Sequence, residues 1–255
     1  MKVVIIMKAL ITGASSGIGR SMAKYLDSLE IELILVGRNK FELEDLQGQL
    51  KSKSKVVVVD LADLTKVKEL YVLTRGEDID ILINNAGFGL FGEFVDTDIN
   101  KELEMINTNI KAVHLLTKLY LRDMKKKNSG YILNVASSAA FGPGPLMATY
   151  YATKAYVNNL TEAINEELRR ANCNVIVSSL CPGPVDTNFN NVAGVQFKAK
   201  PLSSDYVAKY AIDKLLQGKA VIIPGFKMKL ALFARRFASR RFIRKITYKI
   251  QEAKK

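Results

Sequence analysis

The sequence is poor in the residues that build disulfide frameworks and metal centres. Its 255 residues contain only two cysteines, Cys173 and Cys181, one histidine, His114, and no tryptophan. Two cysteines are too few for a disulfide framework and fit a reducing cytoplasmic compartment, so we expect both to be small buried side chains. A single histidine excludes a metal site with several histidine ligands. We interpret His114 as structural and predict no metal site.

Long apolar stretches are also missing. No stretch reaches about 18 consecutive apolar residues, so we expect no membrane-spanning helix. The opening "MKVVIIMKALITG" is broken by Lys8 and runs into a glycine loop, without a cleavage site where a signal peptide needs one. We interpret it as the start of a buried first strand, and leave open whether translation begins at Met1 or Met7.

Positive charge is in excess, and its distribution is uneven. The formal net charge is +13 at pH 7. Residues 226–255 contain eleven Lys or Arg and one acid, Glu252, a net +10, so the preceding 225 residues carry only about +3. The body of the protein is therefore close to neutral, and the basic character belongs to the tail.

Short apolar runs alternate with helix-like segments before the tail. Six of the runs are almost continuously apolar, as in strands that are covered on both faces. Repeated strand–helix alternation predicts an α/β fold, a doubly wound and mainly parallel seven-stranded sheet with helices on both faces. We expect a single domain, 1–225, followed by the tail, 226–255. The expected strands are 8–12, 32–37, 55–60, 80–84, 131–137, 174–182 and 220–225, and the expected helices are 17–29, 40–51, 63–75, 97–126, 150–171 and 203–217.

A glycine-rich loop, "ITGASSGIGR", follows the first expected strand and opens the first helix. Glycines there let the backbone approach a pyrophosphate, which the helix N–H groups and dipole attract. Glycine triplets also occur in tight turns, so the position between strand and helix is what indicates dinucleotide binding. The expected cofactor contacts in this loop are Gly13, Ser15, Ser16, Gly17, Ile18 and Gly19.

The end of the second expected strand bears on the phosphate state of the cofactor. An acid there binds the ribose hydroxyls of NAD, whereas a cation accommodates the 2′-phosphate of NADP. Gly37 stands where an acid would be, and Arg38 follows it. We therefore expect NADP(H) to be preferred, with NAD(H) as the alternative. Arg38 could also be a solvated cation at the start of a helix, without a role in cofactor binding. Asp60 and Leu61 would lie beside the adenine, and Asp60 would also be able to cap the following helix.

Six motifs follow one another along the chain: "TGASSGIG" (12–19), "NNAG" (84–87), "NTNIKA" (107–112), "NVASS" (134–138), "YYATK" (150–154) and "CPGPVDT" (181–187). Together they resemble the short-chain dehydrogenase/reductase family, in its compact single-domain branch, over residues 7–225. The resemblance implies a Rossmann-type fold and NAD(P)-dependent oxidation of alcohols or reduction of carbonyls. It also implies further cofactor contacts, from Asn85, Ala86, Gly87, Pro182, Gly183, Val185 and Thr187.

The family's catalytic group is Asn-Ser-Tyr-Lys, which the resemblance places at Asn109, Ser137, Tyr150 and Lys154. Helical spacing brings both Tyr150 and Tyr151 onto the face of Lys154 and does not choose between them. The interval of thirteen residues from Ser137 to Tyr150 is the family's usual one and selects Tyr150. Tyr151 is then a bystander that packs against the pocket wall or a subunit contact.

Each member of the group has an expected role. Tyr150 would be the proton donor in reduction, and the Lys154 ammonium would lower the pKa of its phenol. By resemblance, Tyr150 and Lys154 would also contact the cofactor, Lys154 through the nicotinamide ribose. Ser137 would polarise the carbonyl oxygen, and Asn109 would hold a water that relays protons.

The tail has apolar residues at 226, 230, 233 and 237, and a shifted stripe at 242, 246 and 250. This pattern predicts two short amphipathic helices or one kinked helix. Such helices can lie in an anionic membrane interface, which would place the protein at the inner face of a membrane, or pack on the body or a partner subunit. We do not expect nucleic-acid binding, because no recognisable binding module is present.

The sequence thus predicts an NADP(H)-dependent oxidoreductase that interconverts a ketone or aldehyde and an alcohol. Its substrate is expected to be apolar or lipid-like, such as a ketoacyl or steroid compound, and to be set by residues 88–98, 139–147 and 186–202. The alternatives are a non-catalytic dinucleotide-binding sensor or scaffold, and a sugar-nucleotide epimerase. A homo-oligomer is expected, because the long helices commonly pair subunits in the family that the chain resembles.

Overall fold

The computed structural model describes residues 7–189, 193–194 and 201–253. The residues outside these ranges are 1–6, 190–192, 195–200 and 254–255. They include the first six residues of the expected strand start and part of the segment 186–202 that we expect to set the substrate.

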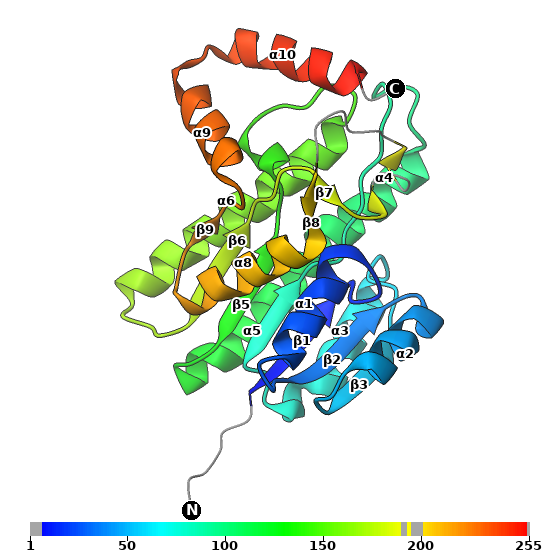
Figure 1. The fold of residues 1–255 in the computed structure, drawn as a ribbon, viewed down its shortest axis with the longest axis vertical. Helices are drawn as coiled ribbons and strands as arrows, with labels where there is room; N and C mark the ends of the chain where they lie inside the picture. Colours follow the sequence, from blue (N-terminus) through cyan, green and yellow to red (C-terminus); the bar gives the residue numbers. More distant parts are fainter. Residues whose placement is uncertain (1–6, 190–192, 195–200, 254–255) are drawn as a thin grey trace, which may run out of the picture.

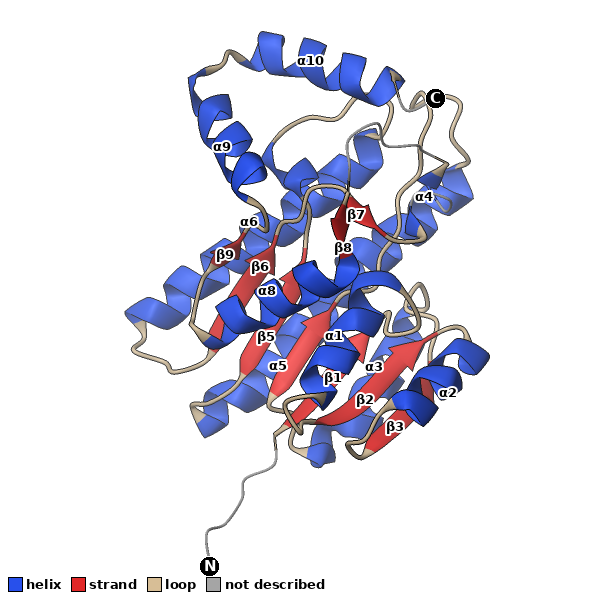
Figure 2. Cartoon of the chain, viewed as in Figure 1, coloured by secondary structure: helices blue, strands red, loops and turns tan. Residues whose placement is uncertain are grey.

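Seven parallel strands form a single sheet in the order β3-β2-β1-β4-β5-β6-β9, which confirms the predicted fold class (Figure 2). Their side chains alternate between the two faces, so that Ala9 and Ile11 enter one core and Leu10 enters the other. Both faces are therefore apolar, which explains the continuous apolar runs. The strands are β1 Lys8–Thr12, β2 Glu32–Gly37, β3 Ser54–Val58, β4 Ile81–Asn84, β5 Tyr131–Val135, β6 Ile176–Leu180 and β9 Val221–Ile222.

Helices cover the sheet on both sides. One face packs against α1 Gly17–Asp27, α2 Lys40–Gln49 and α8 Ser204–Leu216. The other packs against α3 Leu64–Thr74, α5 Val113–Lys127 and α6 Ala148–Arg170. At the edge of the sheet β3 is less covered than we expected, because it has one strand neighbour and leaves Val58 50% exposed. Cys181 is buried as expected, whereas Cys173 is only half-buried.

The long helix expected over 97–126 is interrupted. It begins as α4 Ile99–Ile106, widens into a π-helical turn over Asn107–Ala112 and continues as α5. Such wide turns are uncommon and frequently occur at functional sites. The turn coincides with the "NTNIKA" motif. It could not be predicted from the sequence, because six residues are too few to show a change in apolar periodicity.

The tail forms two helices, one of the two arrangements predicted. These are α9 Phe226–Ala234 and α10 Arg240–Glu252, joined through a 3₁₀ turn at Arg235–Phe237. Figure 1 shows them arching over the carboxyl ends of the strands, beyond the small parallel ladder of β7 Val185–Asp186 and β8 Leu202–Ser203. None of the helices in the described residues is long and apolar enough to cross a bilayer.

Candidate active site

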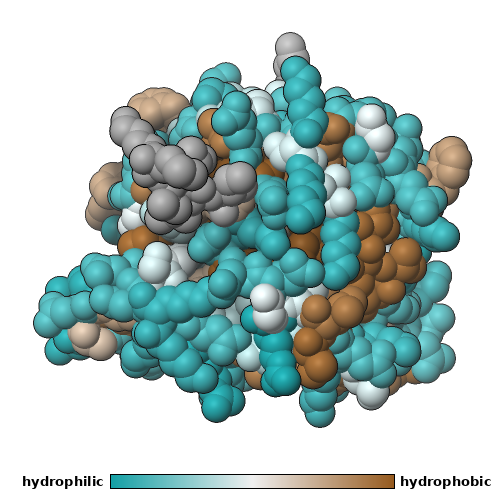
Figure 3. Space-filling view, turned by 90° about the horizontal axis from the view of Figure 1, so that it is seen from below, coloured by the Kyte–Doolittle hydropathy of each residue, from teal (hydrophilic) through white to brown (hydrophobic). Residues whose placement is uncertain are grey.

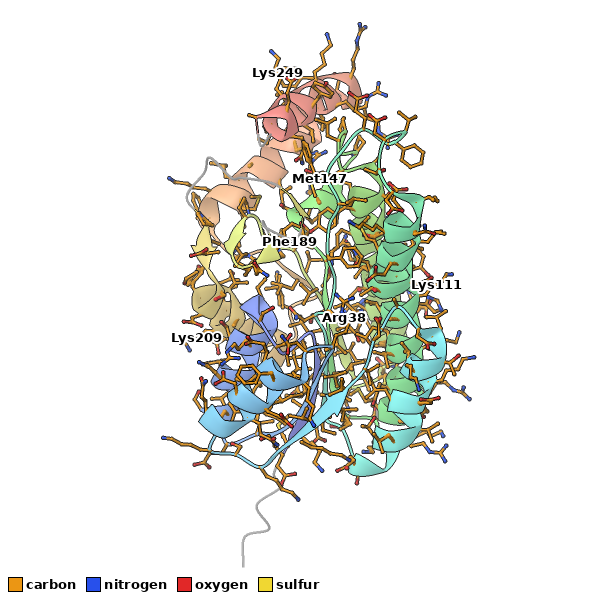
Figure 4. The ribbon with its side chains drawn as sticks, turned by 90° about the vertical axis from the view of Figure 1, so that its right-hand side faces the viewer. Arg38, Lys111, Met147, Phe189, Lys209 and Lys249 are labelled. Atoms are coloured by element: carbon orange, nitrogen blue, oxygen red, sulfur yellow. The ribbon has the colours of Figure 1, made fainter. Side chains whose placement is uncertain are left out.

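A cavity of about 1050 Å³ lies between the carboxyl ends of the strands and the tail helices. It is lined by every residue predicted to contact the cofactor except Gly19, and by every predicted catalytic residue except Asn109. In Figure 4, Arg38 lies near the middle of the molecule, with Met147 and Phe189 closer to the helix that carries Lys249. The structure thus gathers these predicted residues from seven separate parts of the chain around one cavity.

The glycine loop after β1 has no room for a side chain at Gly13 or Gly19. A Cβ on Gly13 would lie 2.9 Å from the Cα of Ala86, and one on Gly19 would lie 2.3 Å from the carbonyl oxygen of Gly13. Gly13 also has a left-handed φ of +66°. The Asn85 amide donates hydrogen bonds to the carbonyls of Thr12 and Gly13, at 3.0 and 3.1 Å, and fixes the loop from behind.

The start of α1 is open to an anion. Its N-cap residue, Ser16, makes no capping side-chain hydrogen bond, and its first turn contains no acid. The N–H groups of the first turn and the positive end of the helix dipole are therefore available to a ligand. The close-packed glycines and this uncapped helix start fit the pyrophosphate of a dinucleotide, which the loop residues Gly13 to Gly19 would hold.

At the end of β2, Arg38 lines the cavity and no acid takes the place of Gly37. The Arg38 side chain is 63% exposed, and its Nη1 lies 2.9 Å from Oε1 of Glu104. A ligand phosphate would therefore compete with Glu104 for this guanidinium. Arg38 is thus a cation at the position of the adenosine ribose of a dinucleotide, but it already forms an ion pair with Glu104.

Asp60 lines the cavity but does not cap the next helix. The N-cap of α3 is Asp63, whose carboxylate accepts hydrogen bonds from the N–H groups of Thr65 and Lys66. Asp60 instead accepts one from the N–H of Ala62 at 3.0 Å, within the turn before the helix. The capping role predicted for Asp60 is wrong because α3 begins at Leu64, so the residue before it is Asp63, and Asp60 lies three residues too early.

Tyr150 and Lys154 lie one turn apart on α6, with the Lys154 Nζ 5.9 Å from the centre of the Tyr150 ring. Both are buried, and Nζ donates a 2.9 Å hydrogen bond to the carbonyl of Val135 at the end of β5. Ser137 follows the same strand, accepts a hydrogen bond from the N–H of Ala139 and hydrogen-bonds Tyr150. The hydroxyl, phenol and ammonium groups therefore meet at one end of the cavity.

Burial dominates the pKa values of this group. It raises the pKa of Tyr150 to about 12, against a smaller lowering by the hydrogen bond with Ser137. Burial also lowers the pKa of Lys154 to about 8. The predicted lowering of the Tyr150 pKa by Lys154 is not observed, because the ammonium donates to Val135 and the phenol is desolvated. At neutral pH the Tyr150 phenol therefore keeps its proton, and the pKa of the Lys154 amine lies closer to neutrality than that of an exposed lysine.

Asn109 lies in the π-helical turn, fully buried behind the cavity wall. Its Oδ1 accepts from the N–H of Phe88, and its Nδ2 donates to the Phe88 carbonyl and to Oγ1 of Thr153. A Cβ on Gly87 would lie 2.8 Å from Asn109 Oδ1 and 3.3 Å from Lys154 Nζ. Asn109 is therefore close to Lys154 but does not face the cavity.

Tyr151 has a role that the sequence did not reveal. Its ring packs against Gly144, stands edge-on to Tyr150 at 6.1 Å between centres, and its hydroxyl accepts a hydrogen bond from Gln251 of α10. Nine tail residues line the cavity, among them Met228, Arg235 and Gln251. We predicted pocket-lining residues only before position 203, and no local pattern in the tail marks those that turn inward.

The described residues contain no candidate metal site. Over residues 7–189, 193–194 and 201–253, no cluster of three or more His, Cys, Asp or Glu residues could hold a metal ion. His114 lies away from the cavity, where its Nδ1 is 2.8 Å from the hydroxyl of Tyr156.

Known proteins resemble the chain along most of its length. The family model for short chain dehydrogenase matches residues 7–196. An uncharacterized oxidoreductase of Staphylococcus epidermidis is 34% identical over 212 residues, which are 82% of this chain and 90% of the relative. Another, from Staphylococcus aureus MRSA252, is 36% identical over 216 residues, 84% of this chain and 92% of the relative.

Solved structures agree with this result. A short-chain dehydrogenase from Sphingobium yanoikuyae in complex with NADPH has a TM-score of 0.81 and 27% identity, over 91% of this chain and 94% of the other. A bulky-bulky ketone specific alcohol dehydrogenase from Comamonas testosteroni has a TM-score of 0.79 and 27% identity, over 91% and 92%. The chain therefore belongs to the short-chain dehydrogenase/reductase family, and it is an NAD(P)-dependent oxidoreductase acting on CH–OH and C=O groups.

Proposed function

We propose that the protein reduces an apolar ketone or aldehyde to an alcohol with NADP(H), using Ser137, Tyr150, Lys154 and Asn109. The proposal rests on one observation. The Ser137 hydroxyl, the Tyr150 phenol and the Lys154 ammonium lie together in the cavity that the glycine loop also lines. A dinucleotide-binding sensor without turnover has less support, because it would need none of these three groups.

NADPH, when bound, supplies the hydride that adds to the carbonyl carbon. Tyr150 then donates its phenolic proton to the carbonyl oxygen, which receives the electron pair of the C=O π bond. Ser137 donates a hydrogen bond to that oxygen as its charge develops. Lys154, with a pKa of about 8, returns a proton to the tyrosinate near neutral pH. Asn109 packs in the cavity wall behind Lys154. A water bound there would relay protons between Lys154 and solvent.

The pKa of Tyr150 suits the proton donation that reduction needs. A phenol with a pKa of about 12 keeps its proton at neutral pH and is ready to donate it, whereas oxidation needs the tyrosinate as base. A preference for NADPH is supported by Arg38 and by the absence of an acid at Gly37. NAD(H) is the alternative, because Arg38 is engaged with Glu104.

The substrate end of the cavity is apolar. Phe189 lies 5.3 Å from Tyr150 between ring centres, and Met147 and Ala139 pack in the same cluster. A bulky or lipid-like ketone fits these walls better than a small polar one. The likeness to a dehydrogenase specific for bulky ketones supports the same choice.

The test is NADPH and NADH oxidation against a panel of small ketones, acyl thioesters and steroid ketones. We expect turnover of an apolar member with NADPH, and its loss in Tyr150→Phe with NADPH binding retained. Binding of NADPH without turnover of any carbonyl compound would instead establish the sensor.

We also propose that the tail docks on an anionic lipid surface. Its apolar stripe is turned outward, with Phe226 78% and Phe237 80% exposed, and Lys and Arg side chains flank it. The opposite end of the molecule is mostly hydrophilic, apart from a hydrophobic patch on one side (Figure 3). Exposed aromatic residues beside a strongly basic face are the arrangement that binds anionic membrane interfaces.

Homo-oligomerisation stays a prediction. The outer faces of α4 and α6 expose Leu103 and Tyr156, by 51% and 40%, which is consistent with a subunit contact there. Light scattering after size-exclusion chromatography would decide between a monomer and a dimer or tetramer.

A further inference from the structure

The tail, residues 226–253, forms one wall of the cavity, which we call its roof. The roof contains two buried polar atoms without hydrogen-bond partners. They are Nη2 of Arg235, in the 3₁₀ turn between the tail helices, and Oε1 of Gln251 on α10. Both residues line the cavity, and Gln251 is completely buried. Buried polar groups in folded proteins are almost always paired, so each unpaired one needs an explanation. A cavity bordered by two of them is suited to a ligand with a polar end.

Arg235 contacts the segment that follows Ser137. A Cβ on Gly142 would come within 1.8 Å of its Nη2, so the guanidinium occupies the space that a side chain there would fill. Gly142 ends the short 3₁₀ segment Ser138–Phe141, which starts directly after Ser137. Tyr151, beside Tyr150, is near enough to influence the pKa of Arg235. The guanidinium therefore borders the substrate end of the cavity.

Arg235 has no acidic partner among the residues that the structure describes. Arg20, Arg38 and Arg169 each form an ion pair with a carboxylate, whereas Arg235 forms none. Other tail arginines, such as Arg236, also lack one but are exposed to water. Arg235 is half-buried, and burial lowers its pKa. A partly desolvated guanidinium without a counter-ion is unfavourable unless a ligand provides one.

The chemistry of the guanidinium identifies that ligand. Its planar fork of N–H donors matches the two oxygens of a carboxylate or phosphate. We propose that the substrate carries such an oxyanion at the end remote from the reacting carbonyl, and that Arg235 binds it. This inference rests on the proposed function for the reacting end, and adds that the substrate is an amphipathic oxo acid or oxo phosphate rather than a neutral ketone.

The first experiment compares matched substrates with the full chain and NADPH. The probes are straight-chain oxo carboxylates of increasing length with the ketone on the penultimate carbon, their neutral methyl esters, and phosphate monoesters of the corresponding hydroxy ketones. We expect kcat/KM for one oxyanion series to exceed that for the esters by about tenfold or more at the length that reaches Arg235. The series that shows the preference identifies carboxylate or phosphate.

Variants assign the preference to Arg235. Arg235→Gln should lower kcat/KM for the oxyanion by about tenfold, mainly through KM, and leave the ester unchanged. Arg236→Gln removes the same charge from the same turn, outside the cavity, and should change neither. An oxyanion preference that survives in Arg235→Gln, or a wild type that prefers the esters at every length, would overturn the inference.

A binding experiment separates this inference from the proposed function. Unreactive alkanoates and alkyl phosphates should raise the Tm of the NADP+ complex of the wild type above that in chloride of equal ionic strength, but not that of Arg235→Gln. Ester turnover without anion selectivity or stabilisation overturns the inference alone. Stabilisation by the anion without turnover of any ketone supports the Arg235 site and overturns the proposed reaction.

Discussion

The hydroxyl of Tyr151 accepts a hydrogen bond from Nε2 of Gln251, a residue one hundred positions further along the chain. This bond connects α6, which carries Tyr150 and Lys154, to the last helix of the tail. The tyrosine next to the predicted catalyst is therefore neither a second acid nor an inert neighbour. It anchors the roof of the cavity.

Replacing each tyrosine of the doublet should separate these two roles. Tyr150→Phe removes the donated proton, and we expect kcat to fall by at least about 100-fold, the usual contribution of a general acid. Tyr151→Phe removes only the bond to Gln251, so we expect most of kcat to remain while KM rises. Steady-state kinetics with NADPH would measure both. A dead Tyr151→Phe beside an active Tyr150→Phe would mean that the assignment is reversed.

The buried Lys154 should make stability depend on pH in the alkaline range. Its pKa falls from 10.5 to about 8 on folding, so between these values the unfolded chain binds the proton and the folded chain does not. The free energy of unfolding should therefore rise as the pH increases from about 8 to about 9, where the pKa of Cys181, raised from 9.0 to about 11 by burial, begins to oppose the rise.

Lys154→Met provides the control for this pH dependence. The variant removes the titrating amine and should lose that rise, which urea titrations at several pH values would show. Above pH 10 the trend should reverse, because the raised pKa of Tyr150 makes the folded chain keep a proton that the unfolded chain releases. Identical pH profiles for the variant and the wild type would contradict the burial of a titrating lysine.

Arg38 should set the preference between the two cofactors. Arg38→Gln removes the cation that would meet the 2′-phosphate, and we expect a loss of about tenfold in NADPH affinity with little change for NADH. Glu104→Gln releases Arg38 from its ion pair, which is exposed and weak, so NADPH affinity should increase by a few-fold at most. Fluorescence titration of both cofactors measures these effects, and equal losses for NADPH and NADH in Arg38→Gln would argue against a phosphate contact.

The glycine loop should tolerate no side chain at Gly19. In Gly19→Ala the new methyl group would meet the Gly13 carbonyl at 2.3 Å, which forces the loop out of shape, so cofactor binding should be lost. Gly48 on α2 is the matched control, because a Cβ there has no neighbour within 4 Å. Gly48→Ala should stabilise the fold by about 0.5–1 kcal/mol and leave cofactor binding unchanged. NADPH fluorescence and thermal unfolding report the two effects.

The exposed stripe of the tail should direct the protein to lipid. Phe226→Ser with Phe237→Ser removes two outward aromatic side chains that do not line the cavity. We expect the wild type to float with vesicles containing phosphatidylglycerol but not with pure phosphatidylcholine, and the double variant to remain behind. Turnover of a water-soluble ketone should be equal in both. If the wild-type protein does not bind anionic vesicles at low salt, the tail covers the cavity but does not bind membranes.

Much of this architecture could be predicted because its causes are local. Continuous apolar runs indicated six of the seven strands of the sheet, since most of the sheet is buried on both faces, and the motifs placed Tyr150, Lys154 and the glycine loop at the strands' carboxyl ends. The π-helical turn at Asn109 and the inward-facing Gln251 could not be found in this way. Both depend on contacts between distant segments, and such contacts leave no periodic pattern in the sequence.

The order of these segments along the chain has a consequence for synthesis. The glycine loop and the residues up to Lys154 emerge from the ribosome well before residues 226–253, which cover them. Strands β1 to β5 can therefore pair before the tail helices are made. The cavity is closed by the tail only when Gln251 reaches Tyr151. We therefore expect a chain whose tail has not yet docked to be less selective among substrates than the complete fold.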